Sequence, residues 1–332
     1  MNNIIFRDPV FDGAADPTVI RRASDGRYFM FYTQRRATLD CSGVEWAHGT
    51  KIGVAVCDAD PFGDAEARAK NVVASGKAAL PPSEEGGGVR GEAEDDGGRD
   101  NDGSPFDKTP CRSRETGCAC WRYAGTADLP FTEGQTTYWA PEVIFDGEVY
   151  RMFVSSVDGV YAEWAGKAEI LQFVSPDLEK WAPLGAVPID SERVIDACAY
   201  PLPEGGWRLW YKDEKRGSHT FYIDTYDFRE WRDGGEATSD TDQEGPNVFA
   251  LGGRYWLIAD VWKGLAVYAS DDLTHFTRRG ENLLPGAASH ADVFVEDGRA
   301  WLVYFTYPEG DRRSAVCVKE LKVDGDGLVV SS

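Results

Sequence analysis

The most regular pattern along the chain is a glycine-containing turn followed by a strand rich in aromatic and apolar residues. The pattern occurs five times, and its turns begin at Asp25, Asp146, Glu204, Gly252 and Asp297. A short apolar run precedes each turn, so each copy reads as two strands joined by a hairpin. Recurrence at a spacing of roughly 45 to 60 residues is typical of proteins that repeat one β-sheet unit.

Two further strands follow the hairpin in most copies. The third is a short apolar segment, and the fourth carries a Trp or a Phe. The segments expected as fourth strands are 121–123, 179–181, 230–232 and 275–277. Four strands in each of five units predict an all-β fold, a five-bladed β-propeller with four antiparallel strands per blade. We expect it to form a single domain over residues 1–332.

A long polar segment interrupts the first blade. Residues 60–120 lie between its third and fourth strands and are rich in Gly, Asp and Glu. Such a composition buries too little apolar surface to offset the entropy lost on ordering, so we expect this insertion to be largely disordered. Whether it is native or an artefact of gene prediction stays open. Strand direction predicts that it leaves the propeller on the face opposite to the starts of the inner strands.

The loops between the second and third strands of each blade should share a face with the starts of the inner strands. Loops held on a rigid scaffold are where binding residues concentrate. The loops are 33–50, 155–167, 212–219, 259–264 and 306–313. They carry side chains suited to gripping a sugar, namely Arg35, Trp46, His48, Trp164, Lys212, His219, Asp260, Trp262 and Tyr307.

Composition narrows the choice of partner. The net charge is −21, which argues against nucleic acid or an anionic membrane, because those partners require clusters of Lys and Arg. No apolar run reaches the roughly 18 residues of a membrane span. A neutral carbohydrate is compatible with this charge. Eleven Trp and fourteen Tyr offer flat faces for sugar rings, although such residues also fill β-rich cores.

The cysteines and the N-terminus bear on the compartment. Seven cysteines form an odd set, and the N-terminus has neither the basic start nor the apolar run of a secretory signal. We therefore expect a reducing, cytoplasmic location. Cys111, Cys118 and Cys120 are close enough to suggest a metal knuckle, but no fourth ligand follows at a regular spacing. A local disulfide or free thiols are favoured over zinc.

Polar residues near the starts of the inner strands should meet at the propeller axis. These residues are Asp16, Trp139, Glu142, Asp196, Glu244 and His290. Three carboxylates in one pit repel one another, and the pKa of the least solvated should rise toward neutrality. An acid and a base at one pH are what cleavage of a glycosidic bond requires. Each carboxylate alone could instead start a turn or accept backbone N–H groups.

Five short motifs resemble those of family-43 glycoside hydrolases and their relatives, which include family 117. They are Ala15-Asp-Pro-Thr-Val, Trp139-Ala-Pro-Glu-Val, Val194-Ile-Asp, Glu244-Gly-Pro and Ser289-His-Ala-Asp, one per blade and in order. The resemblance spans nearly the whole chain apart from the insertion. The chain departs from the usual pattern at Ala197, where the family has Pro, and at Glu142, where it has Asp.

The resemblance implies a role for each carboxylate. Asp16 is implied as general base, Asp196 as the residue that tunes the pKa of the acid and orients it, and Glu244 as general acid. His290 is implied to lie beneath the pocket near a calcium ion, directly or through water, at the centre of the propeller. No other cofactor is required. Substrate contacts are expected from Trp139, Glu142, His290, Arg35, His48, His219 and Trp262.

The expected reaction is hydrolysis with inversion, in which Glu244 protonates the leaving oxygen while Asp16 activates a water. This mechanism requires a carboxyl separation of about 6.5–9.5 Å. The long loop 33–50 favours a closed pocket and exo-action, as in arabinofuranosidases and xylosidases. In relatives of family 117 a His is thought to be the acid, so His290 or His219 stays an alternative to Glu244.

Three other functions stay open. A retaining mechanism, as in families 32 and 68, is accompanied there by Asn-Asp-Pro and Glu-Cys motifs that this chain lacks. Phosphorolysis, as in family 130, needs a basic cluster, for which Arg35, Arg36 and Lys212 are the candidates. A catalytically inactive propeller that binds carbohydrate or serves as a scaffold belongs to a different class.

Overall fold

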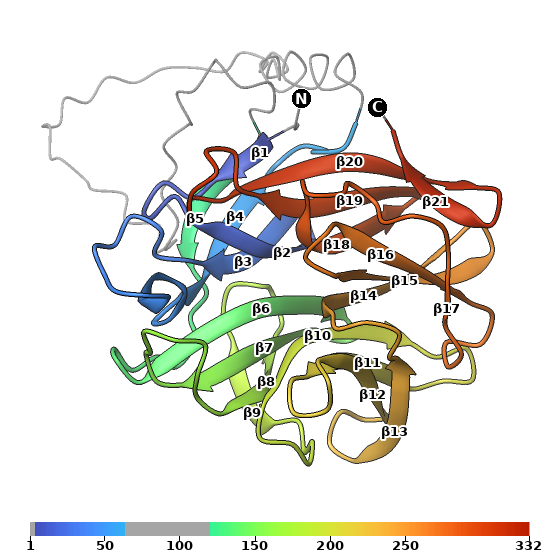
Figure 1. Cartoon of the computed structure of the whole chain (residues 1–332), viewed down its shortest axis with the longest axis horizontal. Coiled ribbons are helices and arrows are strands. Elements are labelled where there is room, and N and C mark those ends of the chain that lie inside the picture. Colours follow the sequence, from blue (N-terminus) through green and yellow to red (C-terminus); the bar gives the residue numbers. More distant parts are fainter. Residues whose placement is uncertain (1–3, 64–119, 332) are drawn as a thin grey trace, which may run out of the picture.

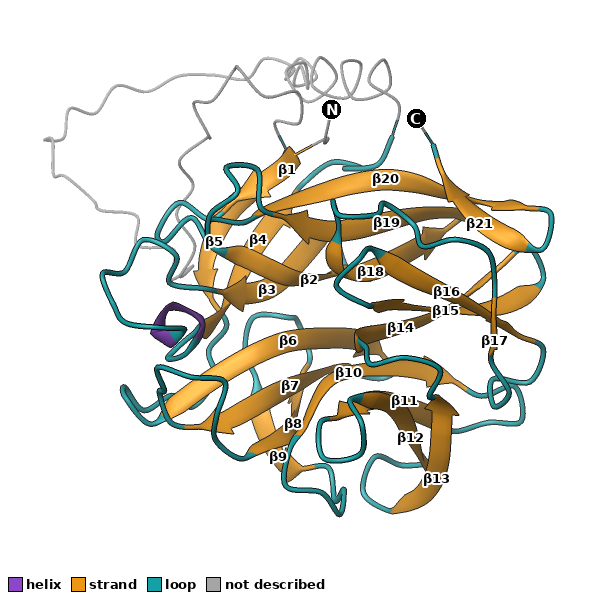
Figure 2. Cartoon of the chain, in the orientation of Figure 1, coloured by secondary structure: helices purple, strands orange, loops and turns teal. Residues whose placement is uncertain are grey.

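The computed structural model describes residues 4–63 and 120–331, and it is a five-bladed β-propeller (Figure 1). The described residues form five sheets arranged around a central axis, with loops at both ends of the strands (Figure 2). The predicted all-β fold is confirmed. Within the described ranges, no helix is long and apolar enough to cross a membrane. The single 3-10 turn there is η1 (Glu45–Ala47).

Four blades are each built from four consecutive antiparallel strands. Blade 1 contains β2 (Ala14–Arg21), β3 (Tyr28–Gln34), β4 (Lys51–Cys57) and β5 (Arg122–Thr126). Blade 2 contains β6 (Thr136–Phe145), β7 (Tyr150–Asp158), β8 (Ala168–Ser175) and β9 (Ala182–Ala186). Blade 3 contains β10 (Val194–Pro201), β11 (Trp207–Asp213), β12 (His219–Thr225) and β13 (Trp231–Thr238). Blade 4 contains β14 (Glu244–Leu251), β15 (Arg254–Asp260), β16 (Leu265–Ser270) and β17 (Thr277–Arg278).

The fifth blade closes the ring with strands from both ends of the described chain. It contains β18 (Ser289–Glu296), β19 (Arg299–Thr306) and β20 (Ala315–Asp324), and β20 then pairs with both β1 (Ile4–Arg7) and β21 (Gly327–Val330). Residues 315–317 of β20 pair with β1, and residues 321–324 pair with β21. Segments from both ends of the described chain therefore pair with the last blade.

The apolar core lies between adjacent blades. Phe31 of blade 1, for example, packs edge-on against Trp181 of blade 2 with ring centroids 5.8 Å apart, and both side chains are buried. The first strands of neighbouring blades contact one another around the whole ring. Burial of large aromatic faces between sheets therefore fixes the positions of the inner strands, since such contacts dominate core energetics.

Two of the expected fourth strands begin later than predicted. Residues 179–181 and 275–276 precede β9 and β17, in turns where Asp177 and Asp272 each accept two backbone N–H groups. The apolar character of Trp181 and Phe276 predicts that they belong to these strands. The Asp side chain instead holds each of them in a turn that mimics backbone hydrogen bonding.

The polar insertion predicted at 60–120 falls between β4 and β5, and residues 64–119 lie outside the described residues. Its two stems are paired, with Val56 opposite Arg122 and Cys57 opposite Tyr28. Tyr28 directly follows the turn that joins β2 to β3, so the stems leave at that end of the blade. This is the end opposite to Asp16.

A ring of polar side chains surrounds the axis, one from each blade. Its members occupy equivalent positions on the five inner strands and are Thr18, Glu142, Cys198, Asn247 and Asp292. Four of them accept a backbone N–H from the next blade. These contacts are Ala199 N to Glu142 at 3.1 Å, Val248 N to Cys198 at 3.2 Å, Val293 N to Asn247 at 3.1 Å, and Val19 N to Asp292 at 2.8 Å.

Two acids of this ring share a buried environment. Burial, followed by the charge of Asp292, raises the pKa of Glu142 to about 8. Asp292 receives hydrogen bonds from Val19 N and from the side-chain amide of Asn247, and these favour its ionised form. Burial raises the pKa of Asp292 as well, and these hydrogen bonds oppose that rise.

The ring predicts a pH dependence of stability. Because the pKa of Glu142 is raised on folding from 4.5 to about 8, the folded state binds more protons than the unfolded state between these values. The free energy of unfolding should therefore fall as the pH rises from 5 to 8. Glu142→Gln, which keeps an acceptor for Ala199 N, should flatten this slope in urea unfolding experiments. An unchanged slope would contradict the assignment.

Candidate active site

Each inner strand carries a local break in pairing near its start, and this break forms the site. The register slips at the same position in β2, β6, β10, β14 and β18. One residue at each slip has a positive φ. These residues are Asp16 (48°), Ala140 (45°), Asp196 (60°), Gly245 (57°) and His290 (20°).

This left-handed backbone turns three polar side chains toward the axis. Asp and Asn tolerate such a conformation better than most residues, which fits Asp16 and Asp196. Glycine is favoured at position 245 for a second reason besides its positive φ. A Cβ on Gly245 would lie only 2.7–2.9 Å from the ring of His290. Glu244 immediately precedes Gly245, so it occupies the position equivalent to Trp139 and not that of the two Asp residues.

The slips open into one cavity of about 480 Å³ at the starts of the inner strands. It is lined by Asp16, Arg35, Ala47, Trp139, Trp164, Arg193, Ile195, Asp196, Lys212, Glu214, Glu244, Asp260, Trp262, Ser289, His290, Phe305 and Tyr307. All three carboxylates that the sequence singled out are in this wall. Arg35, Trp139, Trp262 and His290, which we expected to contact substrate, are there too.

Asp16 is buried and held on two sides. Nη2 of Arg35 donates to both of its carboxylate oxygens, at 3.1 and 3.2 Å, and Nδ1 of His290 lies 3.6 Å from Oδ1. Nη1 of Arg35 donates to the hydroxyl of Tyr307 at 2.8 Å. Loops of blades 1 and 5 thus fix the orientation of the Asp16 carboxylate.

Glu244 belongs to a chain of ion pairs that runs along the wall. Nζ of Lys212 lies 3.2 Å from Oε2 of Glu244 and 3.1 Å from Oε1 of Glu214, and Glu214 also pairs with Arg193. Although burial opposes it, the charges of Glu244, Asp196 and Glu214 hold the pKa of Lys212 above its usual value. The Glu244 side chain is 30% exposed, whereas that of Asp16 is 5% exposed. Glu244 is therefore the more accessible of the two to a ligand.

Asp196 connects the other two carboxylates. Its Oδ2 accepts the N–H of Gly245 at 3.0 Å, and its own N–H donates to Oγ of Ser155. Burial raises its pKa to about 6, and the charges of Glu244 and Asp16 add to this rise while those of His290 and Lys212 oppose it. Asp196 thereby holds the backbone beside Glu244.

Asp260 is a further buried carboxylate in the wall. It accepts N–H groups from Trp262 at 2.7 Å and from His290 at 3.1 Å. Burial, followed by the charge of Glu244, raises its pKa to about 6. Asp260 links the loop of Trp262 in blade 4 to the slip at His290 in blade 5, so it has a positioning role.

Three residues expected to contact substrate lie outside the wall, and these expectations need correction. Glu142 belongs to the polar ring of the axis. His48 is buried behind the aromatic wall, with its ring 5.0 Å from Trp139 and 6.1 Å from Trp164, and burial lowers its pKa to about 4. His219 pairs with Glu236 at 2.7 Å on the outer strands of blade 3.

Arg193, Glu214, Ser289 and Phe305 line the cavity and were not singled out from the sequence. Ser289 could have been found, because it is the neighbour of His290 at the position equivalent to Glu244. Arg193 and Glu214 flank predicted strands, but no sequence pattern indicates that they pair with each other. Their place follows only from the packing of the loop before β10 on the loop after β11.

The described residues give no support for a metal centre. Among them, no three His, Cys, Asp or Glu side chains form a group that could hold a metal ion. His290 faces Asp16 and packs on Gly245, and four ring side chains beneath are occupied by backbone N–H groups. We therefore derive no step through calcium, and its contact with His290 stays a prediction. Cys111 and Cys118 of the suggested knuckle lie outside the described residues.

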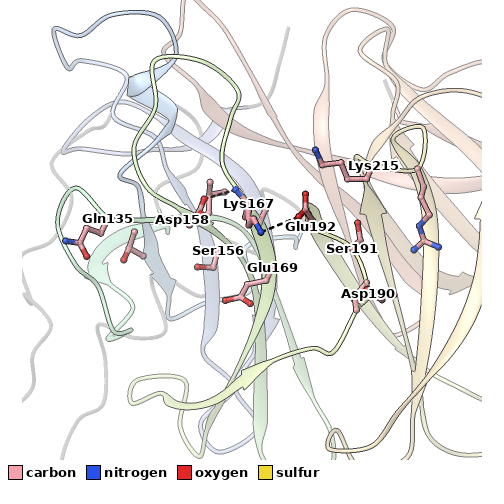
Figure 3. A pocket seen from close by; sticks show the side chains of 14 residues that line it. Gln135, Ser156, Asp158, Lys167, Glu169, Asp190, Ser191, Glu192 and Lys215 are labelled. Carbon is pink, nitrogen blue, oxygen red and sulfur yellow. Dashed lines mark hydrogen bonds and ion pairs between the residues drawn. The ribbon is translucent and has the colours of Figure 1, made fainter.

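A second hollow lies beside the cavity between blades 2 and 3. It has a volume of about 840 Å³, and its wall includes Asp158, Lys167, Glu169, Glu192 and Lys215 (Figure 3). Lys167 bridges the two sides through Glu192, at 3.3 Å. Its lining residues include no Trp, Tyr or Phe, so it lacks the flat apolar faces that line the central cavity.

Comparisons with known proteins agree on the fold. No protein-family model matches this sequence, and comparison with curated proteins finds no match. Among solved structures, a thermostable family-43 glycoside hydrolase is 17% identical, with coverage of 98% of this chain and 96% of that one and a TM-score of 0.64. An exo-1,5-α-L-arabinanase from a bovine ruminal metagenomic library is 15% identical, with coverage of 98% and 99% and a TM-score of 0.58.

A family-32 enzyme has a similar fold. The Bombyx mori β-fructofuranosidase is 13% identical and has a TM-score of 0.62, and the match covers 100% of this chain and 65% of that chain. This chain thus has the five-bladed propeller fold of these structures, as the motif resemblance implied.

The close approach of Gly245 and His290 predicts a sensitive position. Gly245→Ala should be destabilising through its positive φ, by about 1–2 kcal/mol, and should also push His290 away from Asp16. Gly253→Ala is the matched control, because Gly253 has φ +80° but no atom within 4 Å of an added Cβ. We expect Gly245→Ala to destabilise the protein more than Gly253→Ala does. We also expect a roughly 10- to 100-fold loss of activity for Gly245→Ala and no such loss for Gly253→Ala. Equal effects in thermal unfolding and activity assays would refute the packing argument.

Proposed function

We propose that this protein is a glycoside hydrolase that acts on the terminal sugar of an oligo- or polysaccharide. The observation that carries the proposal is that Asp16, Asp196 and Glu244, from three different blades, line one cavity together with three Trp side chains. Several carboxylates that line one cavity can supply the acid and the base that glycosidic cleavage needs. The shared fold of the family-43 structures supports the same function.

The proposed roles follow from the environment of each carboxylate. Glu244, the more exposed of the two reacting groups, protonates the leaving oxygen as general acid. Asp16, oriented by Arg35, activates a water as general base, and inversion at the anomeric carbon results. Asp196 is a positioning residue, because its bond to Gly245 N fixes the backbone that carries Glu244.

The aromatic residues favour a neutral sugar held in a pocket. Trp164 and Trp262 are 59% and 55% exposed and lie on loops of blades 2 and 4, while Trp139 is buried deeper and donates through Nε1 to Ala47 O. Flat faces of this kind bury the apolar side of a sugar ring. A cavity of about 480 Å³ suits a terminal residue, and the arabinanase and xylosidase neighbours motivate arabinofuranosides and xylosides as first substrates.

The same contacts weaken the alternatives. Phosphorolysis needs cations that are free to bind phosphate, but Arg35 and Lys212 are each paired with a carboxylate of the wall. Arg36 donates to the backbone oxygens of His48 and Glu45. A His acid is disfavoured at His219, which lies outside the cavity, while His290 remains the alternative to Glu244. A retaining reaction, as known for fructan-cleaving propellers, is distinguished by product stereochemistry.

Substitution of the acid tests the proposed roles. Glu244→Gln should reduce turnover of an alkyl glycoside by roughly 10²- to 10⁴-fold, and much less with a dinitrophenyl leaving group, which needs no protonation. Asp196→Asn should slow turnover of both substrates, because it disturbs the position of Glu244 and not only the supply of its proton. The measurement is kcat on both substrates, with circular dichroism as the check on folding. Activity of Glu244→Gln within tenfold of the parent on the alkyl glycoside would exclude its acid role and direct attention to His290.

The anomer released tests the mechanism. We expect the first product seen by proton NMR to have the configuration opposite to that of the substrate, because Asp16 delivers water to the far face of the sugar. Release of the same configuration would indicate a covalent intermediate and would reassign Asp16 as the nucleophile.

A further inference from the structure

A groove opens on the opposite face of the propeller, between blades 2 and 3. It has a volume of about 980 Å³ and is lined by the turn between β6 and β7, by the turn between β12 and β13, and by parts of β7 to β9. These turns lie at the other end of the strands from Asp16 and Glu244, so the groove is separate from the catalytic cavity.

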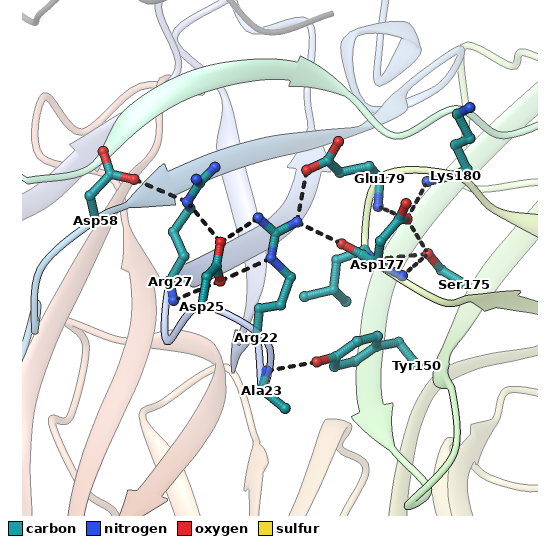
Figure 4. Close-up of polar contacts among 11 residues, drawn as sticks. Arg22, Ala23, Asp25, Arg27, Asp58, Tyr150, Ser175, Asp177, Glu179 and Lys180 are labelled. Carbon is teal, nitrogen blue, oxygen red and sulfur yellow. Dashed lines mark hydrogen bonds and ion pairs between the residues drawn. The ribbon is translucent and has the colours of Figure 1, made fainter. Parts of the chain in front are cut away.

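At two other junctions an arginine of one blade donates hydrogen bonds to the turn of the next blade. Arg22 of blade 1 crosses to blade 2, where it donates to Asp177 O at 2.9 Å and to Glu179 at 2.7 Å (Figure 4). Arg208 of blade 3 likewise donates to Leu273 O of blade 4 at 2.9 Å.

Between blades 2 and 3 the contact is of another kind. Nε of Arg151 donates to Asp146 of its own blade at 2.6 Å, and its guanidinium lies over the ring of Phe228 in blade 3, 3.9 Å from the ring centroid. Among the described residues, no side chain of blade 2 donates a hydrogen bond to the backbone of the turn 226–230.

Aromatic rings form one wall of the groove. The four rings belong to Trp207, Tyr226, Phe228 and Trp231. Tyr226 is 64% exposed, yet it is held in place, because a Cβ on Gly206 would lie 2.8 Å from its ring and Arg232 lies 5.6 Å from its centroid. An exposed aromatic face in a fixed orientation is a preorganised stacking surface.

The opposite wall supplies polar groups. Gln172 is 95% buried, and its Oε1 has no hydrogen-bond partner among the described residues; the same is true of Nε1 of Trp231. Both atoms have almost no accessible surface, so a ligand would instead meet the exposed side chains of Glu148, Asp227 and Arg229, which also line the groove. The charges of the side chains that line the groove nearly cancel, because three of these side chains are acidic and two are arginines.

We propose that this groove is a second carbohydrate-binding site, which holds a neutral segment of the polysaccharide whose end is cleaved in the catalytic cavity. The combination of an exposed aromatic face with polar side chains and little net charge fits a sugar chain. The inference rests on the proposed function, because the polymer bound is the substrate class of the cavity.

Affinity electrophoresis tests the site without turnover. The Glu244→Gln variant would be run in native gels that contain arabinoxylan or linear arabinan. Three double variants, which add Tyr226→Ala, Tyr226→Phe or Phe145→Ala to Glu244→Gln, would be run beside it. Phe145 is the matched control, because it is 41% exposed near the same hairpin but does not line the groove. Trp262→Ala reports binding at the catalytic cavity.

We expect one polymer to retard the parent, with the affinity reduced at least fivefold by Tyr226→Ala and unchanged by Tyr226→Phe and Phe145→Ala. In the active protein, in which Glu244 is unchanged, Tyr226→Ala should raise KM for the polymer. The same substitution should leave kcat/KM for an aryl glycoside within twofold of the parent value. Retardation that is unaffected by Tyr226→Ala, or lost only with Trp262→Ala, would overturn the proposal, as would absence of retardation. Hydrolysis of the aryl glycoside is scored separately, so failure of the groove is distinguished from failure of the proposed function.

Discussion

The slip in pairing at the start of every inner strand is the constraint on which the rest of the site depends. A regular strand would direct its side chains to the two faces of the sheet, between the blades. A left-handed residue after the first ladder pairs changes that direction and presents a side chain along the axis. The five inner strands then supply five such positions around one cavity. The protein fills three of them with Asp16, Asp196 and His290.

The slips are costly for residues other than glycine, and the structure around them explains how they persist. Strain at a single backbone position is maintained only where the surroundings over-determine it. At Asp196, Ser155 accepts the backbone N–H and Gly245 donates to the side chain. At His290, Asp260 accepts the backbone N–H. Asp196 and His290 are therefore held by contacts with neighbouring blades.

The sequence was sufficient to predict the fold and much of the site for a physical reason. Hairpin turns and aromatic strands are local patterns, and a repeat of five units leaves few arrangements that bury all the sheets. Asp16, Asp196 and Glu244 could be placed because each adjoins an inner strand. Glu142 and His48 were misjudged because strand position alone does not tell which side chain points into the cavity and which points beneath it. Pairs such as Arg193 with Glu214 depend on loop packing, which no local pattern encodes.

The double pairing of β20 has a consequence for how the ring can open. Its first residues are bonded to β1 and its last to β21, so the two ends of the described chain are fastened to one strand at separate places. Fraying of either end leaves the other ladder intact. The two ladders differ in what they join, because β1 leads into β2 of blade 1 whereas β21 directly follows β20 and stays within blade 5. Release of the short β1 ladder alone would therefore remove the strand pairing that ties blade 5 to blade 1.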